Sequence, residues 1–586
     1  MSDSRPPQER AFRLDMWWAP VAAALVAGIV HIFRVDSIFY FLYGAEAQGM
    51  LLASALAKGQ GFIDLALPGH PAHVREPPLF YLSLAAIIKT FGFKMPAMKV
   101  FMWLGYVATA AAAALFFQRR GRPWQAFLAS LWCVLSFELF RFFTGPKSDV
   151  PFMALVLFSL FFLDLFMERL HKNEADDTKR GSRYMMPFLA AVSVLLCLAA
   201  FFTRSLGLAL FMAGAGQLFI YGRKRLSFLQ RLKWAAVLIV PLVLALSSWT
   251  LHTASMESAG EYNYVDWFLM DLDPDSPEMI AADFHAPLMG EIPRISFEDF
   301  LVRSVRHGIM YPAHVYNMLT GGGVSTSETA VFPKVQGAYL YAVYGFLLLI
   351  AFLGGYYTER GRSPLVFIFL AAYFAAIVTW PMDDPRLLFP LLPFAAFYTL
   401  YGFYELVFLI AGKAAQKPVV ARACTIVTAV AFIVLIACHL AANINYYRSV
   451  SSLPAYQMRP GFQVRFVSPA HRDSYRLLDR IRKQAKPGAI IMYHSPPPCR
   501  LVTGHPCSPI PFSKDDEKVR QYIMENNIDY VVMDEFGRVF PEGPGQFVWR
   551  VLDSVNKSYA EDFETVYEIP GSSSKVLRVK READKD

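Results

Sequence analysis

Charged residues are scarce in this chain of 586 residues: they make up only 18% of it, against about 25% in a typical soluble protein. Hydrophobic residues reach 55%, and the mean hydropathy is +0.33. This composition excludes a protein that is water-soluble throughout, a disordered chain and a collagen-like chain. It also excludes a small disulfide scaffold, because the chain is long and has only six cysteines. The composition therefore indicates a polytopic membrane protein.

Several motifs of catalysis and binding are missing from the sequence. It contains no Walker A phosphate loop, no GxSxG nucleophile elbow and no HExxH zinc motif. No Cys–His zinc pattern supports a nucleic-acid-binding module. The net charge of +8 is better explained by the excess of Lys and Arg in the cytoplasmic loops of membrane proteins. Nucleic acid is therefore not an expected partner.

Eleven segments are predicted to span the membrane, since a helix needs about 20 apolar residues to cross the hydrocarbon core. They are residues 15–33, 97–117, 124–142, 150–167, 185–203, 205–221, 234–252, 336–356, 364–380, 387–411 and 422–441. The first is not a cleavable signal peptide, because no small-residue cleavage site follows it. Residues 77–92 form a shorter apolar segment that begins with two prolines and contains Lys89. We expect an interfacial helix there.

The charges of the connecting loops predict the orientation of the chain. If 77–92 is not a span, the five loops on one side carry 18 basic and 5 acidic residues, counting Arg422. By the positive-inside rule this side, with the N-terminus, faces the cytoplasm. A bacterial inner membrane fits, and an archaeal or endoplasmic membrane is not excluded. The periplasmic side would then hold residues 34–96, the acidic loop 253–335 and the C-terminal segment.

Two domains are predicted, a membrane domain of residues 1–441 and a soluble α/β domain of residues 442–586. The second prediction rests on helix patterns that alternate with strand patterns, namely helices at 473–485 and 515–527 and strands at 488–493 and 528–534. The expected fold class is an α-helical polytopic membrane protein, with about 11 spans plus interfacial helices and a C-terminal α/β domain.

The cysteines divide by location. Four lie in predicted spans and are expected to be packing residues: Cys133, Cys197, Cys424 and Cys438. Cys499 and Cys507 lie in the α/β domain, and they can form a disulfide if the compartment is oxidising. The alternative is a metal pair, but no nearby CxxC or histidine spacing supports a metal site.

Ionisable residues at the edge of a membrane are energetically costly, so each of them is a candidate for function. Most of them gather at the predicted outer edge: Asp36, Glu46, Asp64, Arg75, Glu76, Lys147, Asp149, Arg204, Asp383, Asp384 and Arg386. Carboxylates can act as general bases or bind sugar hydroxyls. Arginines offer a planar fork that suits phosphate. Acids and cations together at one membrane face suggest a lipid-phosphate substrate.

Four stretches of sequence occur in a characteristic order. They are ASALAKGQGF at 53–62 with REPPLFY at 75–81, TGPKSDVPF at 144–152, FTRSLG at 202–207, and DPRLLFPLLPF at 384–394. This ordered set resembles a large superfamily of polytopic glycosyltransferases that use polyprenyl-phosphate sugars. The superfamily includes protein O-mannosyltransferases and lipid A aminoarabinose transferases. The C-terminal α/β segment is also similar to the tails of bacterial members.

The resemblance implies an inverting transfer, in which an acceptor hydroxyl attacks the anomeric carbon and polyprenyl phosphate leaves. A carboxylate of the first outer loop would take the proton. Members commonly carry an Asp-Glu pair there, which aligns without gaps on Ala45-Glu46. Glu46 is therefore the expected base, with Asp36 in reserve, although an acid at a helix N-terminus would also suit Glu46. Asp149 matches a second acidic position of the family, and capping of the next helix is its alternative role.

Basic residues would hold the phosphate and its charge. The expected donor-binding residues are Arg204, Arg386, Lys147, Arg75 and Glu76. Arg204 is the strongest candidate, and a snorkelling arginine is its alternative interpretation. Lys147 could instead anchor the chain at the interface. Arg386 could pair locally with Asp383 and Asp384, and Arg75 could pair with Glu76.

The expected function is transfer of a hexosyl or pentosyl group from a polyprenyl-phosphate donor to a hydroxyl of a lipid glycan, a protein or a surface polysaccharide. Membrane lipids are the other expected partners. The chemistry requires no cofactor, and a role for a divalent metal stays open. Two other classes compete: a transporter or flippase of lipid-linked sugars, which should show repeats and broken spans, and a non-catalytic envelope scaffold.

Overall fold

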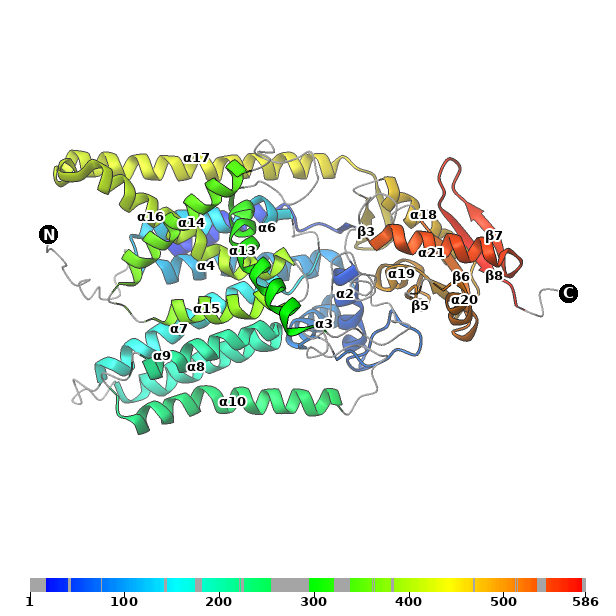
Figure 1. Ribbon diagram of the computed structural model, residues 1–586, viewed down its shortest axis with the longest axis horizontal. Helices are drawn as coiled ribbons and strands as arrows, with labels where there is room; N and C mark the ends of the chain where they lie inside the picture. The colour runs from blue at the N-terminus through cyan, green and yellow to red at the C-terminus, as the bar shows by residue number, and fades with distance from the viewer. Residues whose placement is uncertain are drawn as a thin grey trace.

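The computed structural model is an elongated molecule, with a helical bundle at one end and an α/β domain at the other (Figure 1). It describes residues 17–40, 44–74, 76–141, 145–173, 182–220, 222, 226–254, 295–320, 338–360, 362, 364–380, 384–466, 469–511, 513, 515–534 and 544–581. The predicted fold class is confirmed: the chain is a polytopic helical membrane protein that also has a few strands.

Seven described helices are long and apolar enough to cross a membrane. They lie within α4 (Met95–Phe117), α7 (Asp149–Asn173), α8 (Ser182–Thr203), α10 (Phe228–Ala254), α14 (Ala338–Glu359), η4 (Pro385–Leu391) with α16 (Leu392–Ala411), and α17 (Pro418–Ser451). Shorter apolar helices are α1 (Trp18–Ile32), α3 (Leu79–Phe91), η2 (Ser205–Gly207) with α9 (Leu208–Ile220), and α15 (Leu365–Val378). Each predicted span falls on one of these helices or on the broken segment described next.

The predicted span at residues 124–142 is wrong as a single helix. The structure has two helices there, α5 (Pro123–Val134) and the short α6 (Phe137–Arg141), with a break at Leu135 and Ser136. A break leaves backbone groups without their helical partners, which is costly at membrane depth unless the segment is buried in protein. Leu135 and Ser136 are both fully enclosed by the bundle.

Polar side chains from two other helices bind the backbone around this break, residues 134–137. His31 of α1 donates to the carbonyl oxygen of residue 134 at 3.0 Å. Asn443 of α17 donates to the carbonyl oxygen of residue 135 at 2.9 Å, and His439 accepts from the amide of residue 137 at 3.3 Å. The helix is therefore interrupted where other helices supply the hydrogen bonds that it gives up.

Helix α17 is longer than the predicted span 422–441. At 34 residues and 1.5 Å per residue it is about 51 Å long, which exceeds the roughly 30 Å of the hydrocarbon core. In Figure 1 its C-terminal end reaches toward the α/β domain. A small sheet follows, in the order β1 (Ile38–Tyr40), β3 (Phe462–Arg465), β2 (Ala455–Arg459), with β1 parallel to β3. This sheet joins the first predicted outer loop to the C-terminal segment.

The α/β domain contains a five-stranded sheet. Its order is β5 (Cys507–Ser508), β4 (Ile490–Met492), β6 (Ile528–Met533), β8 (Lys575–Val579) and β7 (Phe563–Glu568). The first three strands are parallel, and the last two pair antiparallel. The helices of the domain are α18 (Pro469–Gln484), α19 (Pro496–Thr503), α20 (Asp516–Glu525) and α21 (Pro544–Ser558). The two predicted helices and two predicted strands correspond to α18, α20, β4 and β6.

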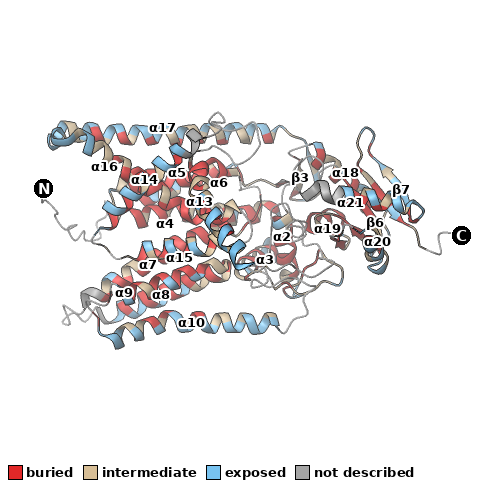
Figure 2. Ribbon diagram, viewed as in Figure 1, coloured by how far each residue is buried: buried red, intermediate tan, exposed pale blue. Residues whose placement is uncertain are grey.

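Helix α13 (Phe297–Thr320) makes up most of what the structure describes of the acidic loop 253–335. Large apolar side chains cover its exposed side: Phe297, Leu301, Val302, Val305 and Ile309. Its buried side carries Arg303 and His307, and it packs against η4 and the bundle (Figure 2). Later in the helix the buried side is mostly apolar or aromatic, so α13 is apolar on both sides over much of its length, which suits a helix whose outer side faces lipid.

Candidate functional site

Glu46 and Lys147 form a buried ion pair at the end of the bundle that faces the α/β domain. Glu46 lies in the first turn of α2 (Gly44–Ala57), and Lys147 lies in the turn before α7. The Glu46 Oε1 atom is 3.0 Å from the Lys147 Nζ atom, with side-chain exposures of 0% and 5%. Burial lowers the pKa of Lys147, while the Glu46 carboxylate opposes this shift. Gly145 leaves room for the pair, since a Cβ atom there would lie 3.0 Å from the Cγ atom of Glu46.

A second ion pair joins Asp149 to Arg204. Asp149 is the first residue of α7, and Arg204 precedes the short helix η2. The Arg204 guanidinium donates to the Asp149 Oδ1 atom. The turn that follows Arg204 requires a glycine at position 207, because a Cβ atom there would lie 2.5 Å from the backbone nitrogen of Phe201. The ion pair thus connects the start of α7 to the end of α8.

A third ion pair joins Arg386 to Asp384 at the start of η4. The Arg386 Nε atom lies 2.9 Å from Oδ1 of Asp384, and a terminal nitrogen lies 2.8 Å from Oδ2. The local pairing that the sequence allowed is therefore present, while its other proposed partner, Asp383, lies outside the described residues. Lys147 lies two residues before Asp149, the first residue of α7, and η4, which carries Arg386, packs against α7. The three ion pairs consequently form one cluster, which we call the edge cluster.

Asp36 belongs to a different group of charges. Its Oδ1 atom lies 2.5 Å from the Nζ atom of Lys99, near the start of α4, and accepts from the Ile38 amide at 3.1 Å. Arg34 and Arg465 are the other charged residues that act on Lys99. Lys99 was not among the predicted site residues, although a lysine inside the predicted span 97–117 is a visible signal in the sequence.

Glu76 and Asp64 belong to the first predicted outer loop. Glu76 accepts a hydrogen bond from the Tyr81 hydroxyl, and its Oε2 atom lies 3.9 Å from Nε2 of His73. Asp64 is buried and accepts from the Gln48 side chain of α2 at 3.2 Å. Asp64 therefore ties the loop to the helix that carries Glu46. Arg75, which was expected to bind the donor or to pair with Glu76, lies outside the described residues.

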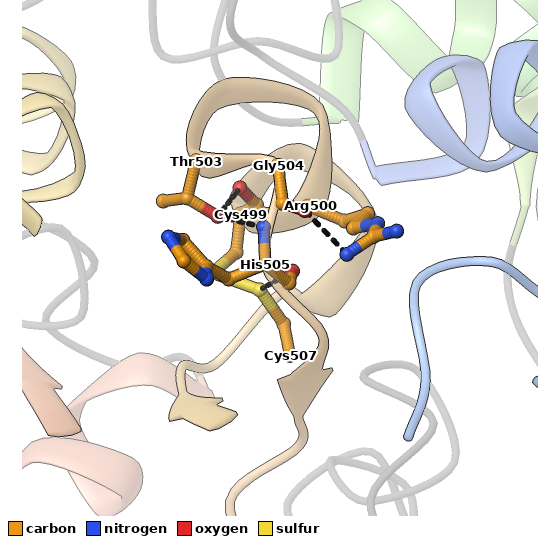
Figure 3. The surroundings of a disulfide bond; sticks show 6 residues. All are labelled: Cys499, Arg500, Thr503, Gly504, His505 and Cys507. Atoms are coloured by element: carbon orange, nitrogen blue, oxygen red, sulfur yellow. Dashed lines mark hydrogen bonds between the residues drawn. A yellow bond between two sulfur atoms is a disulfide. The ribbon is translucent and has the colours of Figure 1, made fainter. Parts of the chain in front are cut away.

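Cys499 and Cys507 form a disulfide in the α/β domain (Figure 3). It joins α19 to β5 across the turn that contains Gly504. The Thr503 hydroxyl donates to the Cys499 carbonyl oxygen at 2.8 Å, and it accepts from the His505 amide at 3.1 Å. Within the described residues, no group of three or more His, Cys, Asp or Glu side chains is arranged to hold a metal ion.

Comparison with known proteins identifies similar structures. No family model matches the sequence, and no curated protein matches it. The oligosaccharyltransferase of Archaeoglobus fulgidus, tethered to an acceptor peptide, is similar with a TM-score of 0.53 and 10% identity, over 96% of this chain and 74% of that chain. ArnT from Cupriavidus metallidurans in the apo state is similar with a TM-score of 0.51 and 11% identity, over 97% of this chain and 98% of that chain.

A further similar structure is the archaeal oligosaccharyltransferase AglB, in complex with an inhibitory peptide and a dolichol-phosphate. Its TM-score is 0.50 at 10% identity, over 97% of this chain and 75% of that chain. At these identities the likeness concerns the fold. The chain therefore shares the fold of these oligosaccharyltransferase structures and of ArnT, in agreement with the fold that the motifs in its sequence implied.

Proposed function

We propose that this protein is an inverting glycosyltransferase that moves a sugar from a polyprenyl-phosphate donor to an acceptor hydroxyl. The edge cluster carries the proposal, because it gathers three acids and three cations from separate segments into one partly buried place, with Glu46 and Lys147 at its most buried point. Such a concentration of charge at a membrane edge is costly and marks a functional site. AglB, which shares the fold, was solved with a dolichol-phosphate, and a lipid phosphate is the ligand class that these cations would bind.

The donor phosphate would be held by Arg204, Arg386 and Lys147. Each of the two guanidinium groups has a carboxylate partner, and the planar array of N–H groups on a guanidinium also suits the oxygens of a phosphate. A guanidinium has five N–H donors, so phosphate oxygens would accept hydrogen bonds from it beside the carboxylate oxygens. In the transfer step the bond between the anomeric carbon and the phosphate oxygen breaks, and the cations stabilise the negative charge of the leaving phosphate.

Glu46 is the proposed general base. Its Oε1 atom lies 3.0 Å from the Lys147 Nζ atom. When the donor phosphate attracts Lys147, the Glu46 carboxylate is released to accept the proton of the acceptor hydroxyl. The hydroxyl oxygen attacks the anomeric carbon from the side opposite the phosphate, so the configuration at this carbon inverts. Asp149 would orient Arg204, and Asp36 would serve the structure through its pair with Lys99.

The acceptor and the topology belong to the same proposal. The acceptor hydroxyl would belong to a lipid glycan, a protein or a surface polysaccharide, and the transferred group would be hexosyl or pentosyl. The chain is a multi-pass membrane protein, and we propose that its N-terminus faces the cytoplasm and its α/β domain the periplasm. Residues 1–441 would form the transferase domain and residues 442–586 the α/β domain, with α17 extending from the first into the second.

A transfer assay on the full-length protein in detergent tests this function. Radiolabelled polyprenyl-phosphate sugars are offered as a panel of donors, with a crude envelope extract as acceptor. We expect the wild-type protein to transfer label from one of these donors. Arg204→Ala should weaken donor binding at least tenfold, because a charge-assisted hydrogen bond contributes about 1.5–3 kcal/mol.

Asp36→Asn is the matched control, since Asp36 also belongs to a buried lysine–carboxylate pair outside the edge cluster. We expect it to retain transfer within a few-fold of wild type, provided that it folds. Donor binding without transfer by the wild-type protein, across the whole panel, would contradict the proposal and favour a transporter or scaffold. Transfer that survives Glu46→Gln but not Asp36→Asn would move the base to Asp36.

A further inference from the structure

Helix α2, which carries Glu46, is covered on two sides. Every residue from Glu46 to Ala55 is buried. On one side Glu46 packs against Gly145 and Lys147 at the end of the bundle. On another side α19 of the α/β domain packs directly against α2, and Figure 2 shows α2 between these two regions. Because most of α2 is buried, this short helix takes its position from the elements packed against it, which also include α3 (Leu79–Phe91).

The first contact between the two regions lies at the start of α2. Gly44 faces Ser495, the residue that precedes α19, and a Cβ atom at Gly44 would lie 2.9 Å from the Ser495 hydroxyl oxygen. Among the described residues outside the backbone of α2 itself, the Ser495 hydroxyl oxygen is the one atom found within 4 Å of that Cβ position. Gly44 is two residues before Glu46, so a displacement of α19 would act on the turn that carries the carboxylate.

The second contact is a hydrogen bond between backbone groups. The Cys507 amide of β5 donates to the carbonyl oxygen of Ala66 at 2.8 Å. Ala66 is fixed to α2 through Asp64, whose carboxylate accepts from the Ala66 amide at 2.9 Å and from the Gln48 side chain at 3.2 Å. The α/β domain therefore reaches α2 at its start through Ser495 and at Gln48 through Ala66.

The disulfide connects these two contacts. Cys499 lies in α19, four residues after Ser495, and Cys507 is itself the donor to Ala66. Figure 3 shows how the bond closes the turn between α19 and β5. The two elements that touch the Glu46 helix and its loop are thus covalently joined to each other.

We propose that the α/β domain is a positioning element of the transferase site. Helix α19 and strand β5, joined by the Cys499–Cys507 disulfide, hold α2 so that Glu46 stays against Lys147. This inference rests on the proposed role of Glu46 as general base. Ser495, Cys499 and Cys507 act through α2 and contact neither substrate. Loss of the disulfide should consequently slow the chemical step, while donor binding by Arg204 and Arg386 should persist.

The first test removes the disulfide from the full-length protein with Cys499→Ala and Cys507→Ala together. We expect kcat to fall at least tenfold and the Kd of the donor to change less than twofold. The control is Leu577→Ala, which weakens the same domain at β8, on the far side of the sheet from β5. We expect the control to keep kcat within twofold. Unchanged kcat in the double variant, or an equal loss in the control, would overturn the proposal.

The second test probes the contact itself by cross-linking Gly44→Cys with Ser495→Cys. The distance of 2.9 Å suits the Cβ and partner sulfur of a disulfide. We expect peptide mapping by mass spectrometry to find residues 44 and 495 cross-linked in most molecules, with kcat preserved. Each single cysteine variant is a control, because it shows whether the new thiol forms a disulfide with Cys499 or Cys507 instead.

The outcomes of the two tests are distinguishable. Two outcomes would overturn the positioning role and leave the proposed function intact. The first is absence of the cross-link. The second is a cross-link that lowers kcat, where reductant restores kcat in the cross-linked variant but in no other variant. A cross-link that forms in a protein whose wild type transfers no sugar would overturn the proposed function and, with it, the positioning role. Formation with full activity, together with the kcat loss in the disulfide variant, is the result that supports the inference.

Discussion

The Glu46 Oε1 atom lies 3.0 Å from the Lys147 Nζ atom, and the pair is buried where the helical bundle meets the α/β domain. The two residues come from α2 and from the turn before α7, 101 positions apart in the chain. Each of these two charges therefore stabilises the other. A donor phosphate that attracts Lys147 would free Glu46 at the moment when a base is required, which couples donor binding to the chemical step.

Lys147→Ala should impair both donor binding and transfer. The substitution removes one cation from the edge cluster and leaves Glu46 buried without its nearest positive charge. We expect the donor Kd to rise at least tenfold, because hydrogen bonds to charged groups contribute about 1.5–3 kcal/mol. Titration with labelled donor measures it. Lys99→Ala, in the other buried lysine pair, should leave Kd within twofold, and equal losses in both variants would contradict a phosphate-binding role for Lys147.

Arg120→Met should strongly destabilise the bundle at a separate buried ion pair. The Arg120 Nε atom lies 2.9 Å from Oε1 of Glu359, which also accepts from the Tyr398 hydroxyl at 2.9 Å. Removing the arginine leaves a buried carboxylate without its cation, which costs about 3–5 kcal/mol. Thermal unfolding in detergent should show a large decrease in Tm. Adding Glu359→Gln should recover part of it, and a double variant no more stable than Arg120→Met would contradict this explanation.

Gly354 and Gly402 allow α14 and α16 to touch backbone to backbone. A Cβ atom at Gly354 would lie 2.0 Å from the Tyr398 carbonyl oxygen, and one at Gly402 would lie 1.9 Å from the Ile350 carbonyl oxygen. Backbone atoms cannot rotate away, so Gly354→Ala and Gly402→Ala should separate the helices and lower the folded yield and Tm. Gly345→Ala in α14 is the control, because a Cβ atom at Gly345 would have no described neighbour within 4 Å outside its own helix. Equal Tm values for all three variants would contradict the contact.

The stability of the α/β domain should decrease in acid because of His471 in α18. Burial, with a smaller effect of His494, lowers the pKa of His471 from its usual value of 6.5 to about 4. Between these values the unfolded chain binds a proton that the folded chain does not bind. Stability should therefore fall as the pH decreases from 6.5 to 4, by up to about 3 kcal/mol. His471→Gln should flatten the dependence of Tm on pH, and an unchanged dependence would contradict this assignment.

Much of the fold follows from patterns that are local in sequence. Apolar runs predicted the helices, and the alternation of patterns after residue 470 predicted α18, β4, α20 and β6. The break between α5 and α6 was not predictable from the apolar run at 124–142. It depends on His31 and Asn443, which bind its backbone from α1 and α17. Hydrogen bonds between distant segments override local helix preference in such places.

The residues of the candidate site could be predicted in part, because they too form a pattern that is local in sequence. Ionisable residues between apolar runs are conspicuous, and Glu46, Lys147, Asp149, Arg204 and Arg386 all stood out. The pairing of Glu46 with Lys147 and of Asp149 with Arg204 was hidden, because it depends on how the bundle packs, whereas the local pairing of Arg386 with position 384 was among the alternatives that the sequence offered. The contribution of the α/β domain to the position of α2 was hidden too, since no local pattern marks a contact such as the one from Gly44.

The most direct test of the account compares Glu46→Gln with the wild-type protein in single-turnover transfer at saturating donor. The amide keeps the shape of the side chain but cannot accept the proton. Our account predicts that Glu46→Gln binds donor with a Kd within a few-fold of wild type and that its transfer rate falls by about 10²–10⁴. A variant that transfers sugar at the wild-type rate would contradict the assignment of Glu46 as the base.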